Sequence, residues 1–490
     1  MASFRRIILA LAFALPLASC SLSNDAGVID VAFIGDPDAM FADGLRLSPA
    51  AQQVRAATSQ GLVRLDENGE VVPGLAERWI VTDDGLSYIF RLQNMEWPDG
   101  SALTGQSVRD RLIRRQRELR GTSLGLDLAQ VTEIRAMTGR VVEFRLASPM
   151  PDFLQLLAQP ELGLLQAGAG TGPMALARRE NLALLNALPP EMRGQPEMSN
   201  WPDRVRTVQV RALPAAEATQ AFDDGTVDLV LNGHLVNLPL ADTGPLSRGT
   251  VRLDATTGLF GFLIRTNEGF LAEPARREAI AMTLDRPALL EPFNIGGWVP
   301  TTRVVAPGLP GDTGTITERW ANIAIEERRA EARRRVAAYA ASAGEEVSLR
   351  IALPDGPGSN MLFAGLARQL GSIGITAERV SMGEAADLAL IDRLARYGSA
   401  RWFLNQFNCS LKRGLCSSKT DRLVREAVEL RDPAEQAERL AEAEADLTRE
   451  NVYIPIGAPI RWSLVRGGVE GFNANRWGLH PLFPLSLAPI

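Results

Sequence analysis

The side chains that could carry catalysis are few and widely separated. The chain has only two histidines, His234 and His480, and it contains neither an H-E-x-x-H nor a G-x-G-x-x-G motif, so no zinc or dinucleotide signature is present. The carboxylate pairs Asp83-Asp84 and Asp223-Asp224 each precede a glycine, which is typical of tight turns rather than of general acid and base pairs. The sequence therefore does not favour an enzyme, a metal site or a bound cofactor.

The N-terminus has the pattern of an exported lipoprotein. Arg5-Arg6 precede an apolar run from Ile7 to Leu17, and Ala18-Ser19 place small residues directly before Cys20. The apolar run is too short to span a bilayer permanently, and small residues before a cysteine are what the lipoprotein signal peptidase requires. We expect residues 1–19 to be removed and the mature chain to begin at an acylated Cys20, whose acyl chains anchor it stably in the cell envelope. The alternative is an ordinary signal peptide with an incidental cysteine.

Export decides how the other two cysteines are interpreted. Cys409 and Cys416 are seven residues apart, and in an oxidising compartment we expect a local disulfide that stabilises the fold by about 2 kcal/mol. The alternative is a metal-binding pair. Because both histidines are distant in sequence and no Cys-x-x-Cys motif exists, the metal interpretation has little support.

Composition and net charge limit the classes of molecule that the chain could bind. At 490 residues with a formal net charge of −6, the chain is long enough for about three domains and is a poor match for a polyanion. The arginine-rich run from Glu326 to Arg335 is interleaved with glutamates, which predicts a helix with a charged outer face rather than a nucleic-acid arm. After the N-terminal segment, no run of 18 apolar residues follows, so we expect a soluble body beside the membrane.

The clearest local pattern lies in residues 61–108. Apolar side chains alternate with polar ones from Leu86 to Leu92, which predicts a strand, and glycine- and proline-containing turns at Asp84-Gly85 and Trp97–Gly100 flank it. Thr104 then stands where a helix N-cap is expected. The segment predicts a small antiparallel sheet followed by a helix.

Strands and helices alternate along the remainder of the chain, as in an α/β protein. Asp432-Pro433 with Glu435 is a strong helix start, because it combines a capping aspartate, a proline in the first turn and a glutamate three residues after the cap. The other expected strands are 142–146, 229–231, 260–267, 347–353, 375 onward and 451–456, and the other expected helices are 153–158, 215–224, 274–284, 326–343 and 361–370.

These elements and their order resemble the solute-binding proteins of oligopeptide, dipeptide and nickel ABC importers, family 5. Besides residues 61–108, the resemblance rests on Gly170-Thr171-Gly172-Pro173 and on Arg276–Ile280 with Leu284-Asp285-Arg286. It extends in order over nearly all of residues 30–480. The pattern at 104–108 departs slightly from that of the family.

The resemblance implies an α/β architecture of two lobes, a periplasmic-binding-protein-like fold of type II with an extra subdomain and a hinge between the lobes. Lobe I would comprise 28–60, 160–262 and 463–490, the additional subdomain 61–159, and lobe II 263–462.

The resemblance also places a candidate ligand anchor. Peptide-binding relatives use an aspartate in a tryptophan-x-x-aspartate segment to hold the α-amino group of the ligand. The matching segment here is Ile391 to Arg396, which carries Arg393 and Arg396, and arginine stands at approximately the place of the aspartate. Arginine cannot hold an ammonium, whereas it forms forked hydrogen bonds to carboxylate or phosphate. The departure predicts a neutral or anionic ligand, or a peptide held by its carboxylate and backbone. The alternatives are that Asp392 or Asp387 replaces the missing aspartate, or that both arginines face solvent.

Neighbouring side chains complete the predicted site. Aromatic rings and side-chain amides that follow the arginines could line a cleft for a ligand with both apolar and polar groups; they are Trp402, Phe403, Asn405 and Gln406. A second candidate pair, Arg461 and Trp462, follows the return strand. The adjacent aromatics could equally be core. The acidic loop Asp36–Asp43 is expected at the edge of the cleft.

The function implied by the resemblance is capture of peptides or peptide-like solutes by a monomeric, lipid-anchored protein of the periplasm, and delivery to an ABC permease in the inner membrane. A different possibility is an envelope scaffold lipoprotein that kept the fold but lost transport. An envelope hydrolase would need a clustered nucleophile and base.

Overall fold

The computed structural model describes residues 27–42, 44–241 and 250–488. The predicted signal peptide, the lipidation site Cys20 and Asp43 of the acidic loop lie outside the described residues. Within the described ranges, no helix is both long and apolar enough to cross a membrane.

Lobe I is built on a mixed seven-stranded sheet. Its core has two faces: α1 (Pro49–Thr58) and α13 (Leu482–Leu485) bury apolar side chains against one, and α5 (Ala215–Asp223) buries Ala218 and Phe222 against the other. The strands, in spatial order, are β10 (Met174–Arg179), β11 (Leu182–Ala187), β12 (Thr207–Leu213), β1 (Val28–Ile34), β13 (Leu229–His234), β20 (Arg461–Val465) and β14 (Val251–Asp254).

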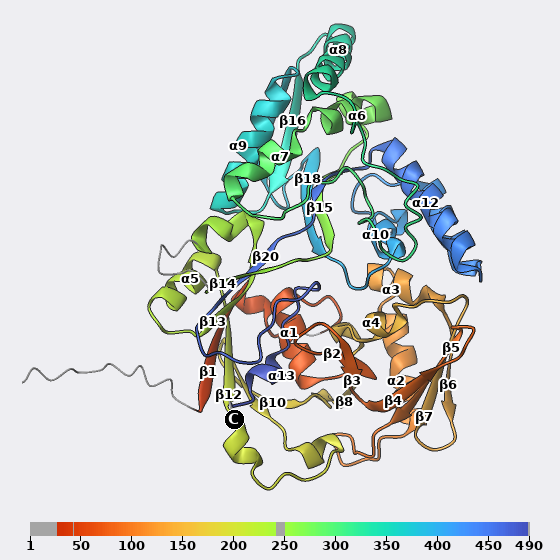
Figure 1. Cartoon of the computed structure of the whole chain (residues 1–490), viewed down its shortest axis with the longest axis vertical. Helices are drawn as coiled ribbons and strands as arrows, with labels where there is room; N and C mark the ends of the chain where they lie inside the picture. Colours follow the sequence, from red (N-terminus) through yellow and green to blue (C-terminus); the bar gives the residue numbers. More distant parts are fainter. Residues whose placement is uncertain (1–26, 43, 242–249, 489–490) are drawn as a thin grey trace, which may run out of the picture.

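Lobe II forms the upper part of Figure 1 around a five-stranded sheet. Its strands, in spatial order, are β17 (Ile375–Ser381), β16 (Val347–Leu353), β18 (Leu388–Leu394), β15 (Gly258–Ile264) and β19 (Tyr453–Gly457). One core contains side chains of α6 (Pro274–Thr283), α7 (Arg286–Leu290), α8 (Ile325–Ala343) and α9 (Pro357–Gly371). A second contains those of α10 (Ala400–Asn405), α11 (Ser418–Glu429) and α12 (Pro433–Glu450).

The additional subdomain lies beside lobe I, at the lower right of Figure 1. Its antiparallel sheet has the order β4 (Ala76–Val81), β5 (Ser87–Leu92), β7 (Val141–Leu146) and β6 (Val131–Met137), accompanied by α2 (Gly105–Glu118), α3 (Ser123–Asp127) and α4 (Phe153–Leu157). The small two-stranded sheet of β2 (Val63–Leu65) with β3 (Val71–Pro73) completes it. A second two-stranded sheet, β8 (Leu165–Gln166) with β9 (Ala169–Gly170), follows the subdomain in the chain. The subdomain shares one continuous apolar core with α10, α11 and α12, so in this conformation it is packed against lobe II.

The local patterns read from the sequence are present. Tyr88, Phe90 and Leu92 of β5 are buried, and Thr104 forms a capping box with Ser107 at the start of α2. Asp432 caps α12 by accepting a hydrogen bond from the Ala434 amide at 2.8 Å. These features depend on near neighbours in sequence, which is why pattern alone predicts them.

The glycines of the 170–173 motif have a packing reason. A Cβ atom at Gly170 or Gly172 would overlap the backbone of Thr58 and Ser59 at the end of α1. Close backbone approach therefore requires glycine here, and neither glycine has a positive φ.

The chain crosses between the two large sheets at 255–257 and again at 458–460. The predicted lobe boundaries at 262/263 and 462/463 fall inside β15 and β20, each of which pairs along its length with a single sheet. The hydroxyl of Thr256 donates a hydrogen bond to the carbonyl of Pro459. The two crossing segments are thus tied side by side, as a two-segment hinge requires.

Candidate functional site

A cavity of about 720 Å³ lies between the lobes. Its lobe I wall includes the end of β1 with Asp36, and Asn232 and His234 of β13, while its lobe II wall includes Arg265 and Arg393. This volume lies within the range of about 300–1,000 Å³ typical of small-molecule sites. The lining also includes Ile34, Val236, Leu263, Leu390 and Ile391, so apolar and charged surfaces face the same space.

A triad of polar side chains, Asp392, His234 and Arg461, joins the lobes, and Asp392 and His234 also line the cavity. Asp392 of β18 accepts a 2.7 Å hydrogen bond from Arg461 Nη1, and its other oxygen lies 3.0 Å from His234 Nδ1. Burial raises the pKa of Asp392, but the charge of Arg461 and the hydrogen bonds from His234 and Arg461 outweigh it and hold that pKa at about 2. Burial and the charge of Arg461 lower the pKa of His234. Because Asp392 is ionised and can only accept, Nδ1 of His234 carries the proton of this hydrogen bond.

The lobe II wall carries an excess of positive charge. Arg265, Arg393, Lys412 and Arg413 line the cavity, and in the described part of the chain no carboxylate forms an ion pair with any of them. The side-chain oxygen of Gln406 accepts from Arg413 at 3.0 Å and from Arg393 at 3.4 Å. Burial, with a contribution from the charge of Arg393, lowers the pKa of Arg413 to about 10, so it stays protonated at neutral pH.

Arg396 faces a second, adjoining cavity of about 290 Å³ that is also lined by Arg413. Its Nη1 and Nη2 donate to the two carboxylate oxygens of Glu161, each at 2.9 Å, and Nη1 also donates to Gln159 at 2.9 Å. Glu161 belongs to the 3-10 helix η3 (Pro160–Leu162), which directly follows the subdomain in the chain, and is 4 % exposed. The charge of Arg396 is therefore neutralised within the protein, and its guanidinium fork is occupied.

Other predicted site residues lie behind the cavity walls. Trp402 and Phe403 are 2 % and 0 % exposed and belong to the core that joins the subdomain to lobe II. All six residues of α10 are buried, so in this conformation a ligand would reach these rings only if the core opened. Trp462 is fully buried and donates its indole N–H to the carbonyl of His234 at 2.9 Å.

The two candidates named as replacements for the missing aspartate are also engaged. Asp392 is held in the triad, and Asp387 accepts a 2.7 Å hydrogen bond from the amide of Arg350. Of the acidic loop, Asp36 lines the cavity as expected.

Asn405 takes part in a buried polar cluster that sequence reasoning missed. Asp127 of α3 accepts from Asn405 at 2.7 Å and from the hydroxyl of Tyr397 at 2.9 Å, and Arg401 donates to the carbonyl of Asp127 and to Gln130. Burial raises the pKa of Asp127 to about 6 despite the opposing charge of Arg401. The cluster joins residues about 270 positions apart and fastens lobe II to the subdomain, so its location could not be read from local sequence.

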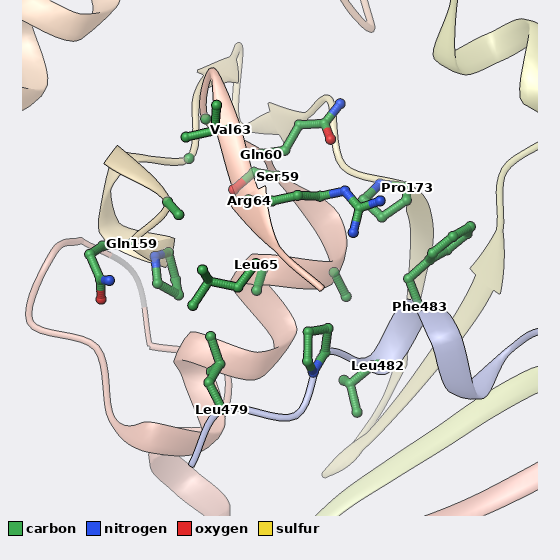
Figure 2. Close-up of a pocket in the computed structure, with 17 residues that line it drawn as sticks. Ser59, Gln60, Val63, Arg64, Leu65, Gln159, Pro173, Leu479, Leu482 and Phe483 are labelled. Carbon is green, nitrogen blue, oxygen red and sulfur yellow. The ribbon is translucent and has the colours of Figure 1, made fainter. Parts of the chain in front are cut away.

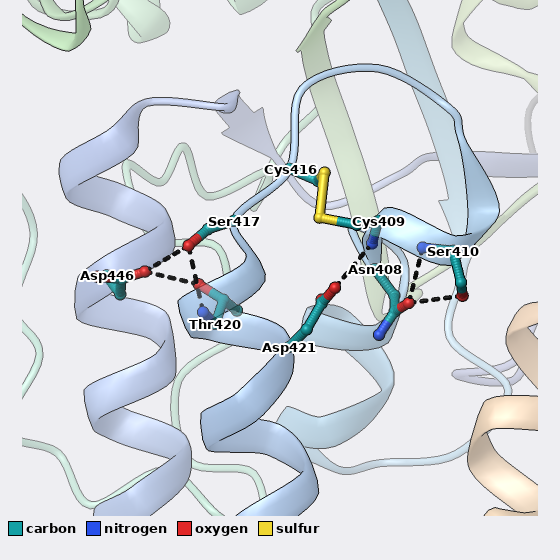
Figure 3. Close-up of a disulfide and its surroundings, with 8 residues drawn as sticks. All are labelled: Asn408, Cys409, Ser410, Cys416, Ser417, Thr420, Asp421 and Asp446. Atoms are coloured by element: carbon teal, nitrogen blue, oxygen red, sulfur yellow. Dashed lines mark hydrogen bonds between the residues drawn. A yellow bond between two sulfur atoms is a disulfide. The ribbon is translucent and has the colours of Figure 1, made fainter.

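A disulfide between Cys409 and Cys416 confirms the predicted pairing (Figure 3). It joins the 3-10 helix η10 (Cys409–Leu411) to the start of α11, where Ser417 donates to Asp446 of α12 at 2.6 Å. The short loop that it closes carries Lys412 and Arg413 to the cavity. Sequence analysis did not name Lys412 and Arg413 as site residues. The signal that could have identified them is the position of two basic residues between the two paired cysteines.

Residues 121–125 match the spacing of a G-x-S-x-G nucleophile motif at Ser123, but the arrangement is not that of a nucleophile elbow. Thr122 caps α3, directly after α2, whereas an elbow follows a strand. Both histidines are engaged elsewhere, His234 with Asp392 and His480 with Asp254 at 3.0 Å. Ser123 therefore has no paired base.

Two further observations narrow the choice of site. The pocket in Figure 2, between Arg64, Pro173 and Phe483, has a volume of only about 30 Å³, which is roughly the space of one water molecule in the liquid. Among the described residues, no group of three or more His, Cys, Asp or Glu side chains is arranged to hold a metal ion. The interlobe cavity is the candidate ligand site.

Comparison with known proteins agrees with this geometry. The family model described as bacterial extracellular solute-binding proteins, family 5, matches residues 70–410, well over half of the chain. Di/tripeptide-binding protein 1 of Pseudomonas aeruginosa (strain UCBPP-PA14) is 22 % identical, over 97 % of this chain and 95 % of the relative. The periplasmic oligopeptide-binding protein OppA of Salmonella typhimurium (strain LT2) is 20 % identical, over 85 % and 84 %.

The fold is also shared with solved structures. Haemophilus influenzae OppA in complex with the peptide RPPGFSPFR superposes with a TM-score of 0.79 at 17 % identity, covering 94 % of this chain and 99 % of the other. This confirms the two-lobed α/β fold expected from the sequence. The relatives are solute-binding proteins rather than enzymes, in agreement with the prediction, and they lend no support to a scaffold role.

Proposed function

Because the chain belongs to the bacterial extracellular solute-binding proteins of family 5, we propose that it captures a small peptide or peptide-like solute in the interlobe cavity and delivers it to an ABC permease. The observation that carries the proposal is the 720 Å³ space enclosed by both lobes, with apolar and charged side chains on facing walls. Relatives named for di- and tripeptide and for oligopeptide binding support the solute class.

The lobes would act as a clamp. In this conformation, the contact of Tyr397 with Asp127 joins lobe II to the subdomain, and that of Arg396 with Glu161 joins lobe II to the segment that follows the subdomain. Opening at 255–257 and 458–460 would break them and admit the solute, and closure around the solute would re-form them. The closed monomer would then present both lobes to the permease.

We also propose that the protein works in the periplasm, held at a membrane by lipid on Cys20. The support is the Arg5-Arg6, apolar run and Ala-Ser-Cys pattern of the N-terminus together with the periplasmic location of the named Salmonella relative. Intact mass measurement of the detergent-extracted protein checks this: an acylated N-terminal Cys20 is expected, and an unmodified N-terminus would refute the anchor.

Native mass spectrometry tests the central proposal. A form beginning after Cys20, exported behind a cleavable signal peptide that adds no lipid, is purified from the periplasm of its natural host without unfolding. Its mass is compared before and after denaturation. The expected result is a co-purified solute of di- or tripeptide size. An apo mass together with no thermal shift in a di- and tripeptide mixture would contradict peptide capture.

A further inference from the structure

We propose that Arg393 and Arg413, held together by Gln406, form a subsite for a carboxylate of the ligand, so that this protein recognises the acidic end of its solute rather than an amino group. The inference rests on the proposed function and names the chemistry that its cavity selects.

The first support is the geometry of the arginine pair. One amide oxygen of Gln406 accepts from Nη1 of both arginines, at 3.0 Å from Arg413 and 3.4 Å from Arg393, and the Gln406 carbonyl accepts from Arg413 at 3.3 Å. Gln406 is 3 % exposed, so it holds the pair from the protein side. A guanidinium has five N–H donors, and the remaining ones are available to a group in the cavity that both arginines line.

The second support is the charge balance. Two carboxylates near these arginines already have cationic partners, Asp392 with Arg461 and Glu161 with Arg396. Asp36, which also lines the cavity, belongs to the lobe I wall. Burial lowers the pKa of Arg393, and so does the charge of Arg396. The charge of Arg393 also lowers the pKa of Arg413. Like charges repel across a partly desolvated site, so an anion between Arg393 and Arg413 would relieve their mutual repulsion.

The third support is the absence of a free acidic anchor on the lobe II wall. Asp392, a carboxylate of this wall, is paired with Arg461, and Glu161 and Gln159 fill the hydrogen-bonding fork of Arg396. Lys412 and Arg265 extend the same positive wall. A ligand ammonium on this side would meet cations, whereas a carboxylate can accept two parallel hydrogen bonds from an arginine.

The carboxylate could be the C-terminus of a peptide or an acidic side chain, and matched probes separate these sources. We would measure the dissociation constant of each member of a set of alanine- and leucine-containing di- and tripeptides by calorimetry. Each peptide is measured in three forms: free, N-terminally acetylated and C-terminally amidated. The expected result is at least a tenfold loss on amidation and less than a threefold change on acetylation. Binding restored by Ala-Glu-Ala amide would identify a side-chain carboxylate as the source, and no restoration would identify the C-terminus; both outcomes support the subsite.

Variants connect the effect to the residues. Arg413→Gln and Arg393→Gln should each weaken the binding of the free peptides at least tenfold. Each should also abolish the difference in affinity between the free and the C-terminally amidated peptides. Arg413→Lys should keep part of the affinity, because it keeps the charge and loses the fork. Arg368→Gln, which removes an exposed charge from α9 of the same lobe, should leave all affinities unchanged, and thermal unfolding confirms that each variant is folded.

The outcomes separate the inference from the proposed function. Equal binding of amidated and free peptides, or retention of the acid preference in both glutamine variants, overturns the carboxylate subsite and leaves peptide capture intact. Failure of every peptide form to bind overturns both.

Discussion

Replacing Asp392 by asparagine should destabilise the protein strongly, because Asp392 is the shared partner of two residues from other strands. Its side chain is 9 % exposed and that of Arg461 is 5 % exposed. The substitution keeps the shape and removes the charge, so Arg461 is left buried beside a neutral amide. Loss of one member of a buried ion pair costs about 3–5 kcal/mol.

The pKa of Asp392 gives a second route to the magnitude. The pKa of Asp392 is about 2 in the folded protein and about 3.9 in an unfolded chain. This difference corresponds to about 2.5 kcal/mol of unfolding free energy at neutral pH. Because the folded pKa is the lower of the two, this stability is fully present above pH 4 and is lost as the pH falls toward 2. The asparagine variant should lack this pH-dependent part.

The assay is urea denaturation of wild type and Asp392→Asn at intervals from pH 7 to pH 2.5. We expect the variant to lose about 3 kcal/mol of unfolding free energy at pH 7, and the difference between the two proteins to narrow below pH 4. Asp355→Asn is the matched control, because Asp355 is 94 % exposed in its pair with Arg379 and an exposed pair contributes at most about 1 kcal/mol. A loss below about 1 kcal/mol for Asp392→Asn, or parallel pH curves, would refute this account of the triad.

Three other predictions concern the elements around the cavity. The double variant Cys409→Ser, Cys416→Ser should lower the unfolding free energy by about 2 kcal/mol, measured by urea denaturation against wild type with and without reductant; insensitivity to both changes would contradict it. Gly233→Ala should cost about 2 kcal/mol or more, because its Cβ would overlap the Trp462 ring, whereas Gly296→Ala meets no atom within 4 Å and should be tolerated; equal melting temperatures of the two variants would count against this packing. Because burial raises the pKa of Asp127 to about 6, its protonation stabilises the folded wild type by about 3 kcal/mol below pH 4, and this stability is lost as the pH rises through about 6. Asp127→Asn should remove this pH dependence from the unfolding free energy; a pH profile like that of the wild type would show that Asp127 is not buried as described.

Much of the fold follows from local sequence. The strand at Ser87–Leu92 and the start of α12 at Asp432 are fixed by alternation, turn residues and caps, all within a few positions. The crossing points were predicted a few residues late, because the apolar runs of β15 and β20 do not reveal which sheet each strand joins.

The site was less accessible to sequence reasoning. Arg393, His234 and Arg413 all line the cavity, but they come from different segments and only the tertiary fold brings them together. Trp402 and Phe403 illustrate the ambiguity of adjacent aromatics: the same residues suit a cleft wall or a core, and here α10 is buried on every side. Their contact with a ligand stays a prediction that this conformation does not favour.

A crystal structure of the protein saturated with a tripeptide that binds it would test the central claim most directly. We predict density in the cavity between Asp36 and Arg393, with an acidic group of the ligand hydrogen-bonded to Arg393 and Arg413. A ligand bound outside the interlobe cavity, or a cavity that contains only solvent at saturation, would contradict the account.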